Sequence, residues 1–144
     1  MREDGYRTSY VRRGIGLAVG LAPVVLLAAS GIYGVPGRDG MRLLGLVPEV
    51  LALLVASLNF YLSFVRALVH RRKNGSVDGY RHVSGFPVVG TFLVVVGTIL
   101  GFGSIVCAVI GLVAVTIDTG GSVWFLIATW RDASLWDVPT SRRS

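Results

Sequence analysis

A long uncharged segment constrains this fold more than any other feature of the sequence. From Phe86 to Ile117 the chain runs for 32 residues without a charged side chain. One straight helix of that length would measure about 48 Å, whereas the hydrocarbon core of a bilayer is about 30 Å thick. The segment therefore predicts two spans, with a turn at the "GFGS" of residues 101–104. The sequence also allows a division in which the turn lies at "DTGG", residues 118–121.

Composition favours a membrane protein over a soluble domain. Hydrophobic residues make up 53% of the chain and charged residues 15%, whereas soluble domains carry about a quarter charged residues. Pro23, inside the first apolar run, predicts a kink. We therefore expect an all-α, integral membrane four-helix bundle that forms a single transmembrane domain over residues 1–144. The predicted spans are residues 14–35, 43–69, 86–101 and 104–130.

The distribution of positive charge predicts the orientation. Twelve of the fourteen Lys and Arg residues lie in the two terminal tails or in the central segment from Arg66 to Arg81, and only Arg38 and Arg42 lie elsewhere. Cytoplasmic loops carry excess Lys and Arg, so we expect a bacterial inner-membrane protein with both termini and a basic loop, residues 70–83, in the cytoplasm. The net charge of +6 then reflects topology, and no nucleic-acid partner is expected. One alternative remains: residues 1–30 also resemble a secretory signal, and its cleavage would leave three spans.

Asp118 interrupts the last apolar run. An ionised carboxylate at the centre of a membrane helix costs about 2.5–3.5 kcal/mol, so it requires a partner, water or a proton. Gly120 and Gly121 follow it and allow backbone conformations closed to other residues. We predict that the fourth span breaks at residues 118–121, with Asp118 and Thr119 capping backbone groups there. The alternatives are an ion or proton site, or a surface loop in which Asp118 is exposed and Trp124 anchors the chain at the interface.

The second apolar run carries further polar candidates. Glu49 follows Pro48 near its start, which suits the positive end of a helix dipole, and Arg66 near its end is expected to reach the membrane surface. Asn59, Ser63 and Arg66 share one helix face, and Asn59 is expected to hydrogen-bond a neighbouring helix. The same stripe is also a candidate surface for a partner within the membrane.

Other motifs predict packing rather than chemistry. Gly16 and Gly20 form one GxxxG pair and Gly97 and Gly101 another, which predicts close helix packing and leaves open a homo-oligomer through these glycine-rich faces. We find no catalytic constellation, no metal-ligand spacing and no cofactor motif in the sequence. The chain is therefore expected to be non-enzymatic, without a metal or cofactor.

Two stretches carry a resemblance. "RHVSGFPVVGTFLVVVG", residues 81–97, and "LVAVTIDTGGSVWFL", residues 112–126, resemble a pattern in small, uncharacterised bacterial four-span membrane proteins of the polymorphic-toxin immunity type. The resemblance covers residues 81–126, and its matching positions are Ser84, Pro87, Gly90, Asp118, Gly120, Gly121 and Trp124. It implies an inner-membrane protein that binds a toxin or shields the toxin's target, with these residues shaping the fold. Toxin contacts are expected from the loop at residues 36–42 or from the face of Asn59 and Ser63, and from residues 118–122 if that stretch is a surface loop.

Three functions follow as hypotheses. The first is a binding protein of the inner membrane that confers immunity to a secreted toxin. The second is an accessory or assembly subunit of a larger membrane complex. The third is a small oligomeric transporter or channel that uses Asp118. In each case the lipid bilayer is a partner, and the first two also require a protein partner.

Overall fold

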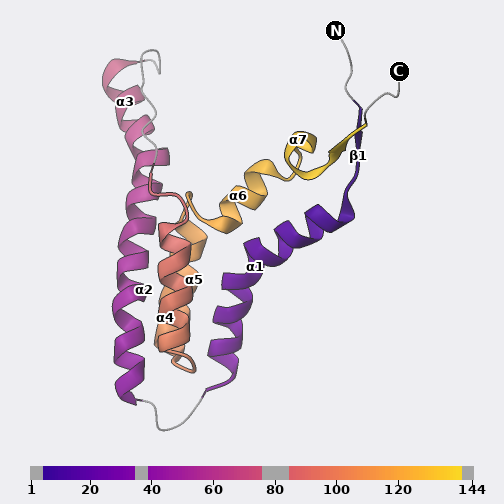
Figure 1. Cartoon of the computed structure of the whole chain (residues 1–144). Coiled ribbons are helices and arrows are strands. Elements are labelled where there is room, and N and C mark those ends of the chain that lie inside the picture. The colour runs from indigo at the N-terminus through magenta and orange to yellow at the C-terminus, as the bar shows by residue number, and fades with distance from the viewer. Residues whose placement is uncertain (1–4, 35–38, 76–84, 141–144) are drawn as a thin grey trace.

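The structure, a computed structural model, describes residues 5–34, 39–75 and 85–140 (Figure 1). Its helical content is 77%, so the predicted all-α class is confirmed. Within the described residues, strand is limited to one antiparallel pair of two-residue segments near the termini. In chain order the elements are β1 (Tyr6–Arg7), α1 (Tyr10–Ile32), α2 (Asp39–Phe60), the π-helical turn η1 (Tyr61–Val65), α3 (Arg66–Asn74), α4 (Val89–Leu100), α5 (Ile105–Ile117), α6 (Ser122–Thr129), α7 (Ala133–Trp136) and β2 (Val138–Pro139).

Helices α2, η1 and α3 form one continuous rod (Figure 1). The rod extends beyond the predicted span of residues 43–69 at both ends. Asp39, predicted to lie in a loop, begins α2, so Pro48 lies inside the helix rather than near its start. At the other end, basic residues 71–73 form the last turn, where they complement the negative end of the helix dipole. Gly75 closes the helix with φ of 71°, a left-handed conformation that glycine adopts without strain.

Helices α4 and α5 form a hairpin, and its turn lies at residues 101–104 as predicted. Ser104 caps α5, because its hydroxyl oxygen accepts a hydrogen bond from the Cys107 backbone N–H at 3.4 Å. Gly103 has φ of 87°, which explains the need for glycine in this turn. At 12 residues, α4 is about 18 Å long and therefore shorter than the predicted third span of residues 86–101.

Helix α1 bends away from the hairpin, and α6 lies beside its first half (Figure 1). Pro23, the proline inside α1, has no backbone N–H to donate to the preceding turn, which is the usual cause of such a bend. The helix begins at Tyr10 rather than Gly14 because Ser9 caps it, accepting from the Arg12 N–H at 3.4 Å. We call the first half of α1, with α6, α7 and the strand pair, the terminal arm.

Different helix ends and chain termini lie at the two ends of the molecule. The termini, the start of α1 and the end of α3 lie toward one end, whereas the end of α1, the start of α2 and the α4–α5 turn lie toward the other (Figure 1). The described basic residues of the tails and of α3 therefore lie at the same end. Residues 36–38 and 76–83 of the two predicted loops lie outside the described residues.

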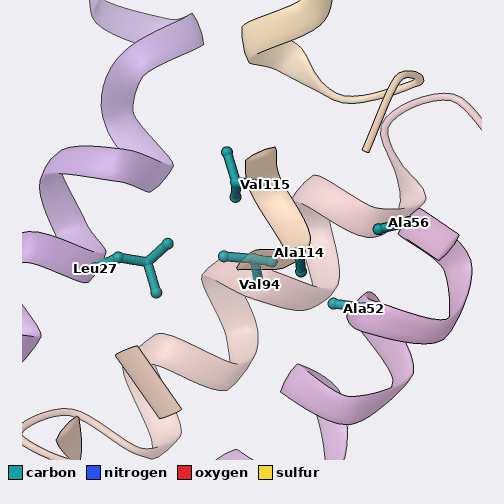
Figure 2. Packing of buried hydrophobic residues seen from close by; sticks show 6 residues of the cluster. All are labelled: Leu27, Ala52, Ala56, Val94, Ala114 and Val115. Atoms are coloured by element: carbon teal, nitrogen blue, oxygen red, sulfur yellow. The ribbon is translucent and has the colours of Figure 1, made fainter. Parts of the chain in front are cut away.

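At the centre of the molecule, α2, α4 and α5 each carry a stripe of buried and mostly small residues, repeated at alternating spacings of four and three residues. Such a period of 3.5 keeps one stripe of each helix facing its neighbours, and small residues allow close approach. Figure 2 shows part of this core, in which α2, α4 and α5 meet Leu27 of α1. The buried stripes are Gly45, Glu49, Ala52, Ala56 and Asn59 on α2, Gly90, Val94, Gly97 and Gly101 on or next to α4, and Cys107, Gly111, Ala114 and Asp118 on or next to α5.

Both GxxxG pairs pack within the chain. A Cβ on Gly16 would lie 2.1 Å from the Trp136 ring, and one on Gly20 would lie 2.0 Å from Leu126 Cδ1. A Cβ on Gly97 would lie 2.7 Å from Glu49 Cγ. Helices of the same chain therefore cover these glycine faces. A homo-oligomer that uses the same faces is a separate hypothesis and stays a prediction.

Candidate functional site

The predicted break in the last apolar run is present, and it forms the edge of a buried polar cluster. Helix α5 ends when the Asp118 N–H donates to the Ala114 carbonyl at 2.9 Å, and α6 begins four residues later at Ser122. The Gly121 N–H donates to the Asp118 carbonyl at 2.9 Å and closes the turn. Only 2% of Asp118 is exposed, so the alternative of a surface loop around Asp118 is wrong.

Asn59 of α2 connects this break to the segment that leads into α4. Its side-chain amide donates to Asp118 Oδ1 at 2.7 Å and to the Phe86 carbonyl at 3.2 Å. Its Oδ1 in turn accepts the Phe86 N–H at 2.8 Å. Asn59 is 1% exposed, so all its polar atoms are used inside the protein. The sequence predicts a hydrogen bond from Asn59 to a neighbouring helix; its partners are Asp118, the residue that caps the end of α5, and the backbone of Phe86 before α4.

Asp118 caps the break only in part. Its Oδ1 also accepts the Gly120 N–H at 3.2 Å, as predicted for a capping residue. Thr119 does not cap a backbone group at the break. Its hydroxyl lies 2.9 Å from that of Ser63 instead, and this pair is exposed at the edge of the cluster. The N–H of Ser122 is satisfied instead by the Thr91 hydroxyl of α4 at 3.1 Å. No local signal in the sequence points to Thr91, since the pairing crosses 31 residues.

Glycines make room for these polar side chains. A Cβ on Gly90 would lie 2.3 Å from Asp118 Oδ2, and one on Gly121 would lie 2.9 Å from the same atom. A Cβ on Gly120 would lie 2.9 Å from Asn59 Nδ2. Gly90, Gly120 and Gly121 are positions where the resemblance expected residues that shape the fold, and the structure gives each a steric reason.

The turn before α4 is strained. Val88 has φ of 68°, a conformation rarely adopted by a β-branched residue, and it directly follows Pro87. The Val88 N–H donates to the Gly120 carbonyl at 3.0 Å, which fixes this turn to the helix break. Pro87 therefore lies beside the cluster, whereas Ser84 lies outside the described residues.

Trp124 packs over the outer edge of the break. Its indole N–H donates at 2.8 Å to the Thr116 carbonyl in the last turn of α5, and its ring meets Phe64 edge-on at 6.2 Å. Trp124 thus ties α6 back to α5 and to η1. Ser63, predicted to share a partner surface with Asn59, remains exposed, whereas Asn59 does not.

Glu49 forms a second buried polar site in the middle of the bundle. It is fully buried, so its predicted position at a helix start is wrong, because α2 begins ten residues earlier. Its Oε1 accepts the Thr98 hydroxyl at 3.0 Å, and Thr98 also lies 2.7 Å from the Val94 carbonyl. One hydroxyl proton serves only one of these acceptors at a time. The carboxyl group fits between α4 and α5, since a Cβ on Gly97 or Gly111 would lie within 2.9 Å of one of its oxygens.

The two buried carboxyl groups share a pattern. In each, one oxygen accepts hydrogen bonds and the other, Glu49 Oε2 or Asp118 Oδ2, has no hydrogen-bond partner in the part of the chain described. Neither forms a salt bridge with a cation among these residues. Both are packed against glycine, so the carboxyl groups act as spacers and hydrogen-bond acceptors between helices.

Within the described residues, an ion pair between Arg13 and Asp137 links the start of α1 to the C-terminal segment. Arg13 of α1 donates to Asp137 at 2.9 and 2.7 Å and to the Trp130 carbonyl at 3.1 Å, and its guanidinium lies 5.2 Å from the Trp130 ring centre. The Arg13 hydrogen bonds lower the pKa of Asp137 below its usual range. The strand pair and a hydrogen bond from the Thr140 N–H to the Gly5 carbonyl, at 2.9 Å, close the same end. Nothing in the sequence predicted this pairing, which crosses 124 residues.

Among residues 5–34, 39–75 and 85–140, no group of three or more His, Cys, Asp or Glu side chains is placed to hold a metal ion. Comparison of the chain with protein-family models, with curated proteins and with solved structures gives no match. Within the described residues, the fold and the site define a class: an all-helical protein with three helical segments long and apolar enough to cross a membrane, and a fourth, shorter apolar helix, Val89–Leu100. The third long segment, Ile105–Thr129, consists of α5 and α6 with the break between them.

Proposed function

We propose that this chain is a multi-pass protein of the bacterial inner membrane that acts by binding a protein partner. The observation that carries the membrane placement is an inverted distribution of side chains. Glycine, alanine and polar residues make up much of the centre, whereas large apolar side chains of α1, α2 and α6 face outward, for example Ile15 at 60% exposed, Leu54 at 61% and Ile127 at 65%. Water would penalise so much exposed apolar area, whereas lipid accommodates it.

Charge supports both termini in the cytoplasm. The described arginines of the tails and the basic last turn of α3 lie at one end of the molecule (Figure 1). Burial also favours a retained first helix, because cleavage after Ser30 would remove the fully buried Leu27 from the core.

Cysteine labelling in intact cells tests this orientation directly. Lys73, in the last turn of α3, and Thr140, which follows β2, are exposed, and so is Gly34, two residues after α1. The ends of α3 and β2 lie toward one end of the molecule and the end of α1 toward the other (Figure 1). We expect a membrane-impermeant thiol reagent to label Gly34→Cys only. Labelling of Lys73→Cys or Thr140→Cys would refute the orientation.

Burial of the polar candidates supports binding rather than catalysis. Asn59, Asp118 and Glu49 are between 0% and 2% exposed, and each has hydrogen bonds to other helices or to the segment before α4. A catalytic group must touch its substrate. These three side chains instead hold the bundle in one shape, which suits a protein whose function is to present a surface.

We propose immunity to a secreted toxin as the particular form of binding, on the strength of the motif at residues 81–126. Three glycines of that motif, Gly90, Gly120 and Gly121, all make room for the buried side chains of Asp118 and Asn59 at the break. The test is competition between sibling strains. Deleting this gene should make cells sensitive to the parent strain, and deleting a toxin gene beside it in the parent should restore survival.

The competition also has a structural control. Val25→Ala, an exposed change on α1, should complement the deletion as well as the wild type does. A deletion strain that survives as well as its parent would refute immunity. Recovery of the chain in a stable larger complex, with no toxin bound, would favour the accessory-subunit hypothesis instead.

A further inference from the structure

Two apolar grooves flank the contact between α1 and α6 in the terminal arm. The larger, about 500 Å³, is lined by Ile15 and Val19 of α1 and by Phe125 of α6, among others. The smaller, about 330 Å³, is lined by Leu17 and Leu21 on another face of α1 and by Ile127 of α6, among others. Volumes of about 300–1,000 Å³ are typical of small-molecule sites.

Each groove has one arginine and one tryptophan in its lining. Arg12 and Trp136 belong to the larger groove, and Arg131 and Trp130 to the smaller. The two tryptophan rings lie 6.1 Å apart, so both grooves have their polar residues at the same end of the arm. The ion pair described in this arm is formed by Arg13 and Asp137. Arg12 and Arg131 are exposed and do not take part in that pair.

We propose that these two grooves bind the acyl chains of anionic phospholipids, with a headgroup phosphate at Arg12 and another at Arg131. The inference rests on the membrane placement proposed above. The apolar walls match hydrocarbon, and a guanidinium group pairs with phosphate oxygens in a two-pronged geometry. Tryptophan prefers the headgroup level, where one side of the ring meets hydrocarbon and the N–H meets water.

The arm's position supports lipid as the occupant. The first half of α1 and α6 diverge from α2 and α4, so those helices do not cover the arm (Figure 1). Arg12 lies in the first turn of α1 and Arg131 two residues after α6, and both helices have these ends toward the chain termini (Figure 1), on the side proposed to face the cytoplasm. Positive charge at the rim of an apolar groove is complementary to a lipid that joins a negative headgroup to hydrocarbon.

Native mass spectrometry of the full chain in mild detergent tests the headgroup. We expect phosphatidylglycerol to bind more tightly than phosphatidylcholine with the same acyl chains. Arg12→Gln and Arg131→Gln should each weaken phosphatidylglycerol binding about five-fold, the effect of one basic residue near an anionic surface. Arg72→Gln, which removes an exposed charge from α3 at the same end, is the control and should change binding less than about two-fold.

Filling a groove tests the acyl-chain site. Val19 lies in the larger groove and Val25 outside both, and each is 65% exposed. Val19→Trp should remove one bound lipid, whereas Val25→Trp should not. If the arginine variants fail to fold, the headgroup comparison on the wild-type chain still decides.

Equal binding of the two lipids by the wild type, or an equal effect of Arg72→Gln and Arg12→Gln, would overturn the proposal. Membrane placement is checked separately by resistance of the chain to alkaline carbonate extraction. A chain that stays in the membrane without a headgroup preference refutes the lipid sites alone, whereas a chain released by carbonate refutes the placement as well.

Discussion

Replacing Asn59 with alanine tests whether the buried cluster stabilises the bundle. The side chain makes three hydrogen bonds, one to Asp118 and two to the backbone of Phe86. Hydrogen bonds between membrane helices contribute about 0.6 kcal/mol on average and at most about 1.7 kcal/mol. Three such bonds amount to about 2 kcal/mol, and the buried groups left without partners raise the cost further. We therefore expect Asn59→Ala to lower the free energy of unfolding by about 2–4 kcal/mol.

The assay is reversible unfolding in mixed micelles of mild detergent and dodecyl sulfate, followed by tryptophan fluorescence. Ser57→Ala is the matched control on the same helix. Ser57 is exposed and its hydroxyl donates to the Leu53 carbonyl of its own helix at 2.7 Å, so the control should change stability by less than about 0.5 kcal/mol. The reasoning is refuted if Asn59→Ala unfolds at the same detergent composition as the wild type, or if the two variants lose equal stability.

Two further predictions concern helix packing and pH. Gly45→Ala should cost about 1–3 kcal/mol, because its Cβ would lie 2.4 Å from the Gly101 backbone, whereas Gly14→Ala, with nothing within 4 Å, should be neutral or stabilising in the same unfolding assay. The Arg13–Asp137 pair should persist above the usual aspartate pKa of about 3.9 and be lost as pH falls through the lowered pKa of Asp137. Trp130 fluorescence should report that loss, and Asp137→Asn should abolish its pH dependence; an unchanged acid transition would contradict the assignment.

Local signals explain which parts of the fold are predictable. Apolar runs mark helices, and the glycines at 101–104 and at 118–121 mark the two places where the backbone turns or breaks. The position predicted for Glu49 is wrong because α2 begins at Asp39, ten residues before it. Its hydrogen bond to Thr98 joins residues 49 positions apart, so no local signal predicts it. Its four-and-three spacing from Gly45 and Ala52 is nevertheless a signal for a buried face, since that stripe repeats along α2.

The terminal pairing has no comparable signal. In the sequence Arg13 is one of the basic residues that predict orientation, and in the structure its side chain is committed to Asp137 across 124 residues. Such long-range ion pairs follow from the tertiary arrangement, which depends on how α1 bends and where α6 lies. The same holds for Thr91, which satisfies the first N–H of α6 because the hairpin brings α4 beside the break.

The role of Asp118 can be resolved by separating its charge from its shape. The Asp118→Asn variant would keep an oxygen able to accept from Asn59 and from the Gly120 N–H, whereas Asp118→Ala would keep neither bond. If Asp118 is a hydrogen-bond acceptor that holds the break, Asp118→Asn should stay within about 1 kcal/mol of the wild type and Asp118→Ala should lose about 2–3 kcal/mol.

A transport role for Asp118 predicts the opposite dependence. Proton or ion movement through the carboxyl group requires a group that can be charged, so Asp118→Asn would abolish flux in proteoliposomes while the protein stayed folded. We expect no flux from the wild type that exceeds that of Asp118→Asn, because Asp118 is 2% exposed and packed against Gly90 and Gly121. Wild-type flux that disappears in a folded Asp118→Asn variant would refute the structural role and establish the transporter hypothesis.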